Sequence, residues 1–203
     1  MLQEELVVTL EQISGTKEEH KKLKKEYYIY NMKYGNIKYC DVANGDGIRT
    51  TLFVSGCTHH CYNCFNQMAW DFEYGKEFTK EVEDEIIKSM SPDYIAGLTL
   101  LGGEPMEIVN QKGLHDFILR VKEIYPNKNI WCFTGYLFED LLEGGKQRCE
   151  YTQDLLNCID VLVDGEYVDS LRNLTLKFKG SSNQRTINVP ESLKNKKVIL
   201  LYK

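Results

Sequence analysis

The sequence lacks a long apolar run, a signal-peptide core and any excess of positive charge. No stretch is apolar for long enough to cross a bilayer, so we expect a cytoplasmic protein with no membrane partner. The formal net charge of −5 gives no electrostatic basis for binding nucleic acid.

The sequence also lacks a paired cysteine framework, because its seven cysteines are an odd number. Three of them, Cys57, Cys61 and Cys64, form one CxxxCxxC run, which in a reducing compartment indicates metal ligation or catalysis. A cubane iron–sulfur cluster that only transfers electrons takes four protein thiolates. Three thiolates would leave one iron open to a substrate. We expect the remaining cysteines to be small buried side chains: Cys40, Cys132, Cys149 and Cys158.

Zinc is the main alternative at the CxxxCxxC run, because His59 or His60 would complete a Cys3His set. Structural zinc sites usually take ligands from two separated pairs, however, and the sequence has no second CxxC or HxxxH. Both histidines also lie in the short gap between the first two cysteines, where closing on one ion is cramped. The spacing favours iron, and a zinc-stabilised binding module without catalysis stays open as an alternative.

Residues 1–31 differ from the rest of the chain. Regularly spaced Leu and Ile residues predict a helix that ends at Gly15, and a stretch rich in Lys and Glu follows. Met32 begins a segment that could stand alone. We therefore expect an N-terminal appendage over residues 1–31, helical or mobile, and a single domain over residues 32–203.

From Thr51 onward the pattern alternates between strands and helices. We expect strands over residues 51–54, 97–101, 129–133, 159–163 and 197–202, and helices over residues 77–90, 114–124 and around 137–158. This alternation predicts an α/β fold with a parallel sheet and crossover helices. Ligands of such sheets bind at the carboxyl ends of the strands. At these ends we place the cysteine run, Gly102–Glu104, Thr134-Gly135 and Asp164-Gly165.

The CxxxCxxC run after one strand and Gly102-Gly103-Glu104-Pro105 after the next resemble the two marks of radical S-adenosylmethionine (radical SAM) enzymes. The resemblance implies an incomplete TIM-type parallel β/α barrel. It also implies that Cys57, Cys61 and Cys64 hold three irons of a [4Fe-4S] cluster. The fourth iron would then take the amino and carboxylate groups of SAM.

The same resemblance implies a set of cofactor contacts. Gly102 and Gly103 lack a Cβ, so the backbone can approach a ligand closely, and Glu104 would support the methionyl ammonium or the local fold. Radical SAM enzymes often have an aromatic residue before the third cysteine, where this chain has Asn63. We expect the adenine contact to come from the Asn63 backbone and Phe65, or from elsewhere in the chain. The cofactor-binding set is Asn63, Cys64, Phe65, Gly102, Gly103 and Glu104.

A narrower resemblance covers most of residues 32–190. Asn44–Arg49 ahead of Leu52–Cys57, Cys64–Asn66 followed by Trp70, and Gly180–Arg185 are similar to the activating proteins of anaerobic (class III) ribonucleoside-triphosphate reductase. Gly180–Arg185 discriminates best, although alone it also fits a Gly/Ser turn with a capping Asn. Asp46 stands where relatives often have Pro, which makes that turn less rigid.

The narrower resemblance implies an activase for a glycyl-radical enzyme. A low-potential donor such as flavodoxin or ferredoxin would supply an electron, SAM would be cleaved to methionine and a 5′-deoxyadenosyl radical, and a glycine of the reductase would lose a hydrogen atom. Pyruvate formate-lyase or another glycyl-radical enzyme is the alternative client. We expect Arg49, Asn183 and Arg185 to bind the protein segment or to close the SAM site.

Overall fold

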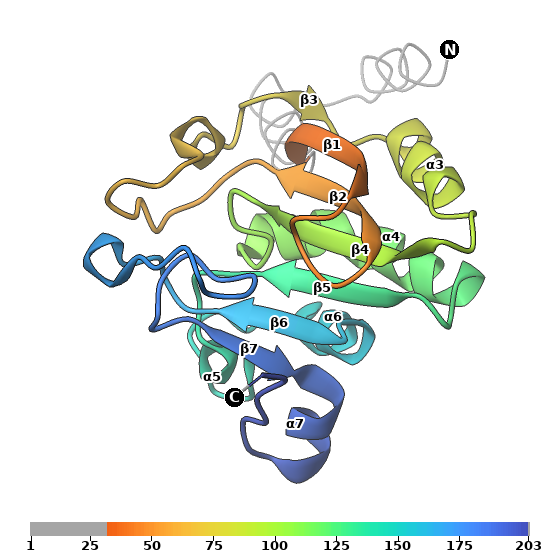
Figure 1. Cartoon of the computed structure of the whole chain (residues 1–203). Helices are drawn as coiled ribbons and strands as arrows, with labels where there is room; N and C mark the ends of the chain where they lie inside the picture. The colour runs from red at the N-terminus through yellow and green to blue at the C-terminus, as the bar shows by residue number, and fades with distance from the viewer. Residues whose placement is uncertain (1–31, 203) are drawn as a thin grey trace, which may run out of the picture. The chain divides into compact units, whose positions relative to one another are not determined.

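The structure, a computed structural model, describes residues 32–202 (Figure 1), and the expected appendage over residues 1–31 lies outside the described residues. Within residues 32–202 the fold is mixed α/β, with a seven-stranded sheet in the order β3-β1-β2-β4-β5-β6-β7. The strands are β1 (Lys33–Asp41), β2 (Ile48–Val54), β3 (Lys76–Glu77), β4 (Ile95–Gly102), β5 (Asn129–Phe133), β6 (Val161–Asp164) and β7 (Arg185–Asn188).

Five α-helices and two short 3-10 helices connect the described strands. They are η1 (Gln67–Trp70), α3 (Lys80–Ser89), α4 (Ile108–Ile124), α5 (Phe138–Leu141), α6 (Thr152–Cys158), η2 (Asp169–Leu171) and α7 (Val189–Asn195). Among these helices, none is both long enough and apolar enough to cross a membrane. The predicted helical region around residues 137–158 is two separate helices, because a turn that contains Gly144 and Gly145 interrupts it.

The centre of the sheet is parallel, as the strand–helix alternation predicts. Strands β2, β4, β5 and β6 pair in parallel, in that order. Their carboxyl ends therefore lie at one edge, and the arrowheads of Figure 1 point toward that edge. The segments that follow these strands are thus brought together although they are far apart in the sequence.

The flanks of the sheet depart from the prediction of an all-parallel sheet. β1 pairs antiparallel with both β2 and β3, and β7 pairs antiparallel with β6. The prediction of a strand over residues 197–202 was wrong, because only Leu200 forms an isolated bridge there, to Ile187. The main chain of Ile199 instead bonds to Asn188 and to the Ser192 hydroxyl, which folds the segment back over α7.

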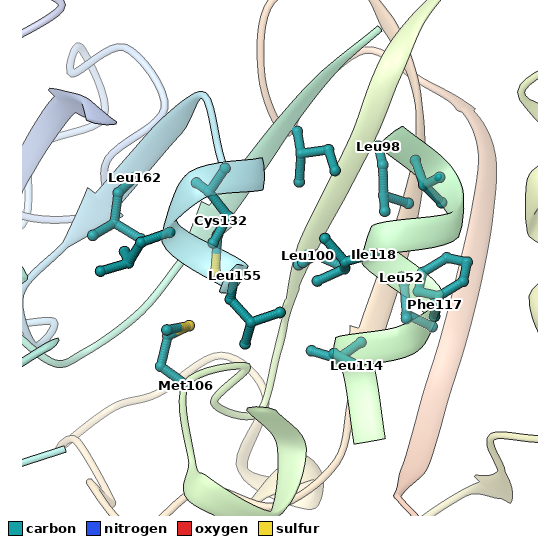
Figure 2. Packing of buried hydrophobic residues seen from close by; sticks show 14 of the residues in the cluster. Leu52, Leu98, Leu100, Met106, Leu114, Phe117, Ile118, Cys132, Leu155 and Leu162 are labelled. Carbon is teal, nitrogen blue, oxygen red and sulfur yellow. The ribbon is translucent and has the colours of Figure 1, made fainter. Parts of the chain in front are cut away.

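The main hydrophobic core lies between one face of the sheet and helices α3, α4 and α6. Figure 2 shows Leu52, Leu98 and Leu100 of the strands near Leu114 and Ile118 of α4. Because side chains of a strand alternate between faces, neighbouring residues of β5 and β6 form a second, smaller cluster on the opposite face. Its members are Trp131, Val161 and Val163, with Phe133, Phe178 and Tyr202 packed against them.

The four cysteines outside the CxxxCxxC run differ in burial. Cys132 is fully buried in the main core, as expected. Cys149 and Cys158 are partly buried. Cys40 is exposed, so the prediction that it is buried was wrong. It lies at an irregularity of β1 with a φ of 55°, where the strand turns away from regular pairing.

Packing of α4 against the sheet should dominate the stability of the domain. Leu114 is 1% exposed on the inner side of α4, whereas Leu119 of the same helix is 39% exposed. We expect Leu114→Ala to lower the free energy of unfolding by about 2–5 kcal/mol, because it removes buried methyl groups and leaves a cavity. Leu119→Ala, the matched control, should cost less than about 1 kcal/mol. Urea unfolding of both variants measures the difference, and equal losses would contradict this packing.

Candidate metal centre and cofactor cavity

A cavity of about 800 Å³ lies at the carboxyl ends of the parallel strands. Its wall includes Cys57 after β2, Gly102 at the end of β4, Thr134 after β5 and Gly165 after β6. This is the edge at which parallel α/β sheets bind ligands. The structure brings all eight predicted site residues to this one wall: Cys57, Cys61, Asn63, Cys64, Phe65, Gly102, Gly103 and Glu104.

The cysteine run lies on a loop that closes on itself after β2. The amide N–H groups of Gly56 and Cys57 donate to the carbonyls of Ala69 and Trp70, at 2.8 and 3.1 Å between N and O. His60 and Asn63 adopt positive φ values of 50° and 56°. Asn tolerates this left-handed conformation better than an aromatic residue does. The backbone therefore gives a physical reason for Asn at the position before the third cysteine.

The surroundings of the three thiols fit thiolate ligands of an iron–sulfur cluster. The N–H of Asn66 donates to Cys64 Sγ at 3.4 Å, the amides of His59 and His60 face Cys57, and that of Tyr167 faces Cys61. Such N–H groups directed at sulfur stabilise thiolates and tune cluster potentials. Within residues 32–202, no three His, Cys, Asp or Glu side chains stand close enough together to hold a metal ion as they are now arranged.

Burial favours the protonated form of two of these thiols, Cys57 and Cys61, in the protein alone. It raises the pKa of the Cys57 thiol to about 12 and raises that of Cys61 above its usual value. A metal that binds a thiol must displace its proton. Cluster binding at this wall is therefore coupled to proton release.

The two histidines of the loop have other partners, which disfavours the Cys3His zinc set. His59 Nδ1 lies 2.8 Å from Glu166 Oε1, and its Nε2 lies 3.1 Å from Glu104 Oε2. Burial alone would lower the pKa of His59, but these two carboxylates raise it above its usual value. The ring of His60 packs against Trp70, with 4.7 Å between ring centroids.

Glu104 is buried and joins three segments of the cavity wall. Its Oε1 accepts from the N–H of Met106 at 2.8 Å, and its Oε2 accepts from the N–H of Gly135 at 2.6 Å. The same Oε2 faces the ring of His59. The structure thus gives Glu104 a role in the local fold, which is one of the two roles that the sequence allows. Its contact with a SAM ammonium stays a prediction.

The two glycines before Glu104 are needed for packing of backbone on backbone. A Cβ on Gly102, whose φ is +116°, would lie 2.6 Å from the carbonyl oxygen of Val54. A Cβ on Gly103 would lie 2.5 Å from the carbonyl oxygen of Gly56. Both contacts are too close for any side chain. The glycines therefore let the ends of β2 and β4 approach each other, a reason that the sequence analysis did not give.

The residues expected to bind the protein segment or to close the SAM site lie outside the cavity wall: Arg49, Asn183 and Arg185. Arg49 is fully buried, with 5.5 Å between its guanidinium and the Trp131 ring, so the prediction that it meets a ligand was wrong. Its Nε donates to Thr99 Oγ1 and its NH2 donates to backbone carbonyls of β4 and β5. Arg185 forms ion pairs with Asp164 and Glu139.

The Gly180–Arg185 motif organises the turn that follows β6. Gln184 Oε1 accepts from the N–H groups of Gly180 and Ser181, and its Nε2 donates to the carbonyl of Gly165 at 2.9 Å. Asn183 Nδ2 donates to the carbonyl of Glu166 at 2.8 Å. The motif therefore fixes the turn from which Glu166 reaches His59.

The segment of residues 167–179 forms another part of the wall that the sequence motifs did not predict. Tyr167 and Asp169 line the cavity, and the Tyr167 hydroxyl donates to Asp169 Oδ1 at 2.7 Å. Asn63 Nδ2 donates to Asp169 Oδ2 at 3.2 Å, which joins this segment to the cysteine loop. The position of the segment between the predicted strand end at Asp164-Gly165 and the Gly180–Arg185 motif is the signal that could have identified it.

Comparison with known proteins agrees with this geometry. Residues 43–187 match the family described as "4Fe-4S single cluster domain", so the cavity with its three cysteines defines a single-cluster iron–sulfur protein. Three of the similar relatives are each named anaerobic ribonucleoside-triphosphate reductase-activating protein. That of Enterobacteria phage T4 is 40% identical over 154 residues, which cover 76% of this chain and 92% of the relative.

The second relative, from Vibrio cholerae, is 41% identical over 155 residues, which cover 75% of this chain and 96% of the relative. That of Escherichia coli K12, with the same name, is 37% identical with the same two coverages. The chain belongs to the family of anaerobic ribonucleoside-triphosphate reductase-activating proteins.

Glu104 and Glu166 both contact His59, but only Glu104 is buried, so they form a matched pair for substitution. We expect Glu104→Gln to lower the free energy of unfolding by roughly 1–3 kcal/mol, because the new amide has one acceptor oxygen and can accept from only one of the Gly135 and Met106 N–H groups. Glu166→Gln should cost less than about 1 kcal/mol, since its carboxylate is half exposed. Chemical denaturation of the protein without metal measures both, and a Glu104→Gln variant as stable as the wild type would contradict the assigned role.

Proposed function

We propose that this protein activates anaerobic ribonucleoside-triphosphate reductase by generating a glycyl radical on it. One observation carries the proposal: three cysteines share the wall of a cavity at the strand ends, in a chain about 40% identical to proteins named for that activation. When bound, a [4Fe-4S] cluster supplies the electron that cleaves SAM into methionine and a 5′-deoxyadenosyl radical. The other residues of the site bind and orient the cluster and SAM, and they shield the radical from water.

We assign the three cluster ligands to Cys57, Cys61 and Cys64. Burial keeps Cys57 and Cys61 protonated in the protein alone, and the amide N–H groups directed at the three sulfurs would stabilise the thiolates once a cluster displaces those protons. Cys57 is the most deeply buried of the three and keeps water from one side of the site. Three ligands leave a coordination position for the amino and carboxylate groups of SAM.

We assign SAM to the wall between the cysteine loop and the end of β4. The Asn63 backbone and the exposed ring of Phe65 are the adenine contacts, and Gly102 and Gly103 face the methionyl part. Glu104 acts as a positioning residue, because its carboxylate fixes Gly135 and His59 around the same cavity. Cys64 belongs to both the cluster and the cofactor wall.

The wider architecture suits a protein substrate. We infer that the four parallel strands are the core of an incomplete TIM-type barrel, whose open side admits a segment of the reductase. We also infer that residues 32–203 form the radical SAM domain and that residues 1–31 are an appendage to it. A low-potential donor such as flavodoxin or ferredoxin would reduce the protein, and the reduced thiols fit a cytoplasmic location.

Substitution of each cysteine tests the ligand assignment. The protein reconstituted with iron and sulfide under anaerobic conditions should be brown and should cleave SAM when reduced. Cys57→Ala, Cys61→Ala and Cys64→Ala should each lower cleavage by at least about 100-fold, since a cubane cluster held by two thiolates is not retained. Cys40→Ala is the matched control, because Cys40 is exposed on β1 and lies outside the cavity wall.

Full activity in any of the three variants would reject the ligand set. A colourless, zinc-loaded protein from anaerobic expression would reject the radical chemistry altogether. The client is tested by the glycyl-radical signal in electron paramagnetic resonance. That signal should appear on anaerobic ribonucleoside-triphosphate reductase and be absent from pyruvate formate-lyase, which serves as the control. The reverse result would identify pyruvate formate-lyase as the client instead.

Removal of residues 1–31 tests the proposed domain boundary. A chain that begins at Met32 retains β1 and every cavity-lining residue, so it should cleave SAM at a rate within about twofold of the full-length protein. Cleavage by both proteins, each reconstituted in parallel, measures this. Loss of the cluster or of folding in the shorter chain would instead make the appendage part of the domain.

A further inference from the structure

The most exposed large apolar side chains of the described residues belong to segments that line the cavity. Five of them exceed the rest in exposed fraction: Phe65 (86%), Leu174 (85%), Tyr62 (78%), Val42 (70%) and Met68 (65%). Two of these five line the cavity, and each of the other three is the immediate neighbour in sequence of a lining residue. Large apolar side chains gathered in water mark an interaction surface, because their burial in a complex is favourable.

The apolar side chains come from opposite sides of the mouth. Tyr62 and Met68 belong to the cysteine loop, and Leu174 belongs to the segment between β6 and β7. In Figure 1 these two segments, orange and blue, lie at the same edge of the sheet. The hydrogen bond from Asn63 to Asp169 joins them. These two sides of the mouth therefore touch each other.

Positive charge accompanies the apolar groups. Arg172 and Lys179 line the cavity, and neither forms a side-chain hydrogen bond or ion pair with another residue in the described part of the chain. The cavity wall carries charges of both signs, since Glu104 and Asp169 line it as well, and Asp169 is an electrostatic neighbour of Arg172. Cations that form no ion pair beside exposed apolar side chains fit a partner surface that carries carboxylates around an apolar centre.

We propose that the mouth formed by Val42, Tyr62, Met68, Arg172 and Leu174 is the docking surface for the reductase. The reductase covers these side chains with an apolar face edged by carboxylates, while its glycine-bearing segment enters the cavity. The inference rests on the proposed function, since a radical formed in the cavity reaches only a glycine that enters it. A small substrate would be held inside the cavity and would leave the outer apolar side chains in water.

The test separates docking from cofactor chemistry. We expect the Val42→Ser/Met68→Ser double variant, whose two side chains lie outside the cavity wall, to weaken binding of the reductase by at least about tenfold, since a few apolar anchors dominate such interfaces. The yield of glycyl radical at limiting reductase should fall by a similar factor. SAM cleavage in the absence of the reductase should stay within about twofold of the wild type.

Tyr94→Ser is the matched control, because Tyr94 is 62% exposed and neither it nor its sequence neighbours line the cavity. This variant should bind the reductase like the wild type. Arg172→Glu should weaken binding as well, and the affinity of the wild type should fall as salt rises.

Each other outcome has a definite meaning. Unchanged reductase affinity in the double variant, with SAM cleavage intact, would overturn the docking surface and leave the proposed function standing. An equal loss of SAM cleavage would also overturn it, because the two side chains would then act on the cofactor site. If this chain self-associates, and the double variant abolishes that self-association but leaves reductase binding unchanged, the surface would be an interface with a second copy of this chain instead. Absence of SAM cleavage by the wild type would reject the proposed function itself.

Discussion

The cavity depends on one buried carboxylate. Glu104 accepts from the main chain after β4 and from that after β5, and it faces the ring of His59 in the cysteine loop. A buried carboxylate without partners would be strongly destabilising, so all three segments must be in place for the fold to tolerate it. The carboxylate therefore fixes the cysteine loop relative to the strand ends before any cofactor is present.

The Gly180–Arg185 motif, which in the sequence only distinguishes one family, also supports the cysteine loop in the structure. Gly180–Arg185 bonds to the turn after β6, and Glu166 of that turn bonds to the other nitrogen of His59. His59 is thus held from two sides, by β4 through Glu104 and by the last part of the chain through Glu166. This link explains physically why a short Gly/Ser-rich stretch far from the cysteines belongs with them in one family.

The sequence made the centre of the fold predictable and left its flanks unpredictable. β4, β5 and β6 are short apolar runs that end in Gly, Thr or Asp, a pattern typical of buried parallel strands. β1 is partly exposed at the side of the sheet, and β7 is held by pairing with a distant strand, so neither shows a clear periodicity. Arg49 was misplaced for a similar reason, because its burial depends on Trp131 and on carbonyls of two other strands.

The floor and the mouth of the cavity differ in how their side chains are satisfied. Polar groups at the floor are paired within the protein, whereas apolar groups at the mouth are exposed to water. At the floor, Glu104 and His59 have their polar atoms satisfied by the protein, which makes a rigid base. At the mouth, Phe65 and Leu174 stand in water, which costs free energy as long as the protein is alone. An enzyme with a small substrate usually closes a lid of its own to exclude water. With a protein client, the client itself can be the lid, so a reactive radical is shielded only when the glycine that should receive it is present.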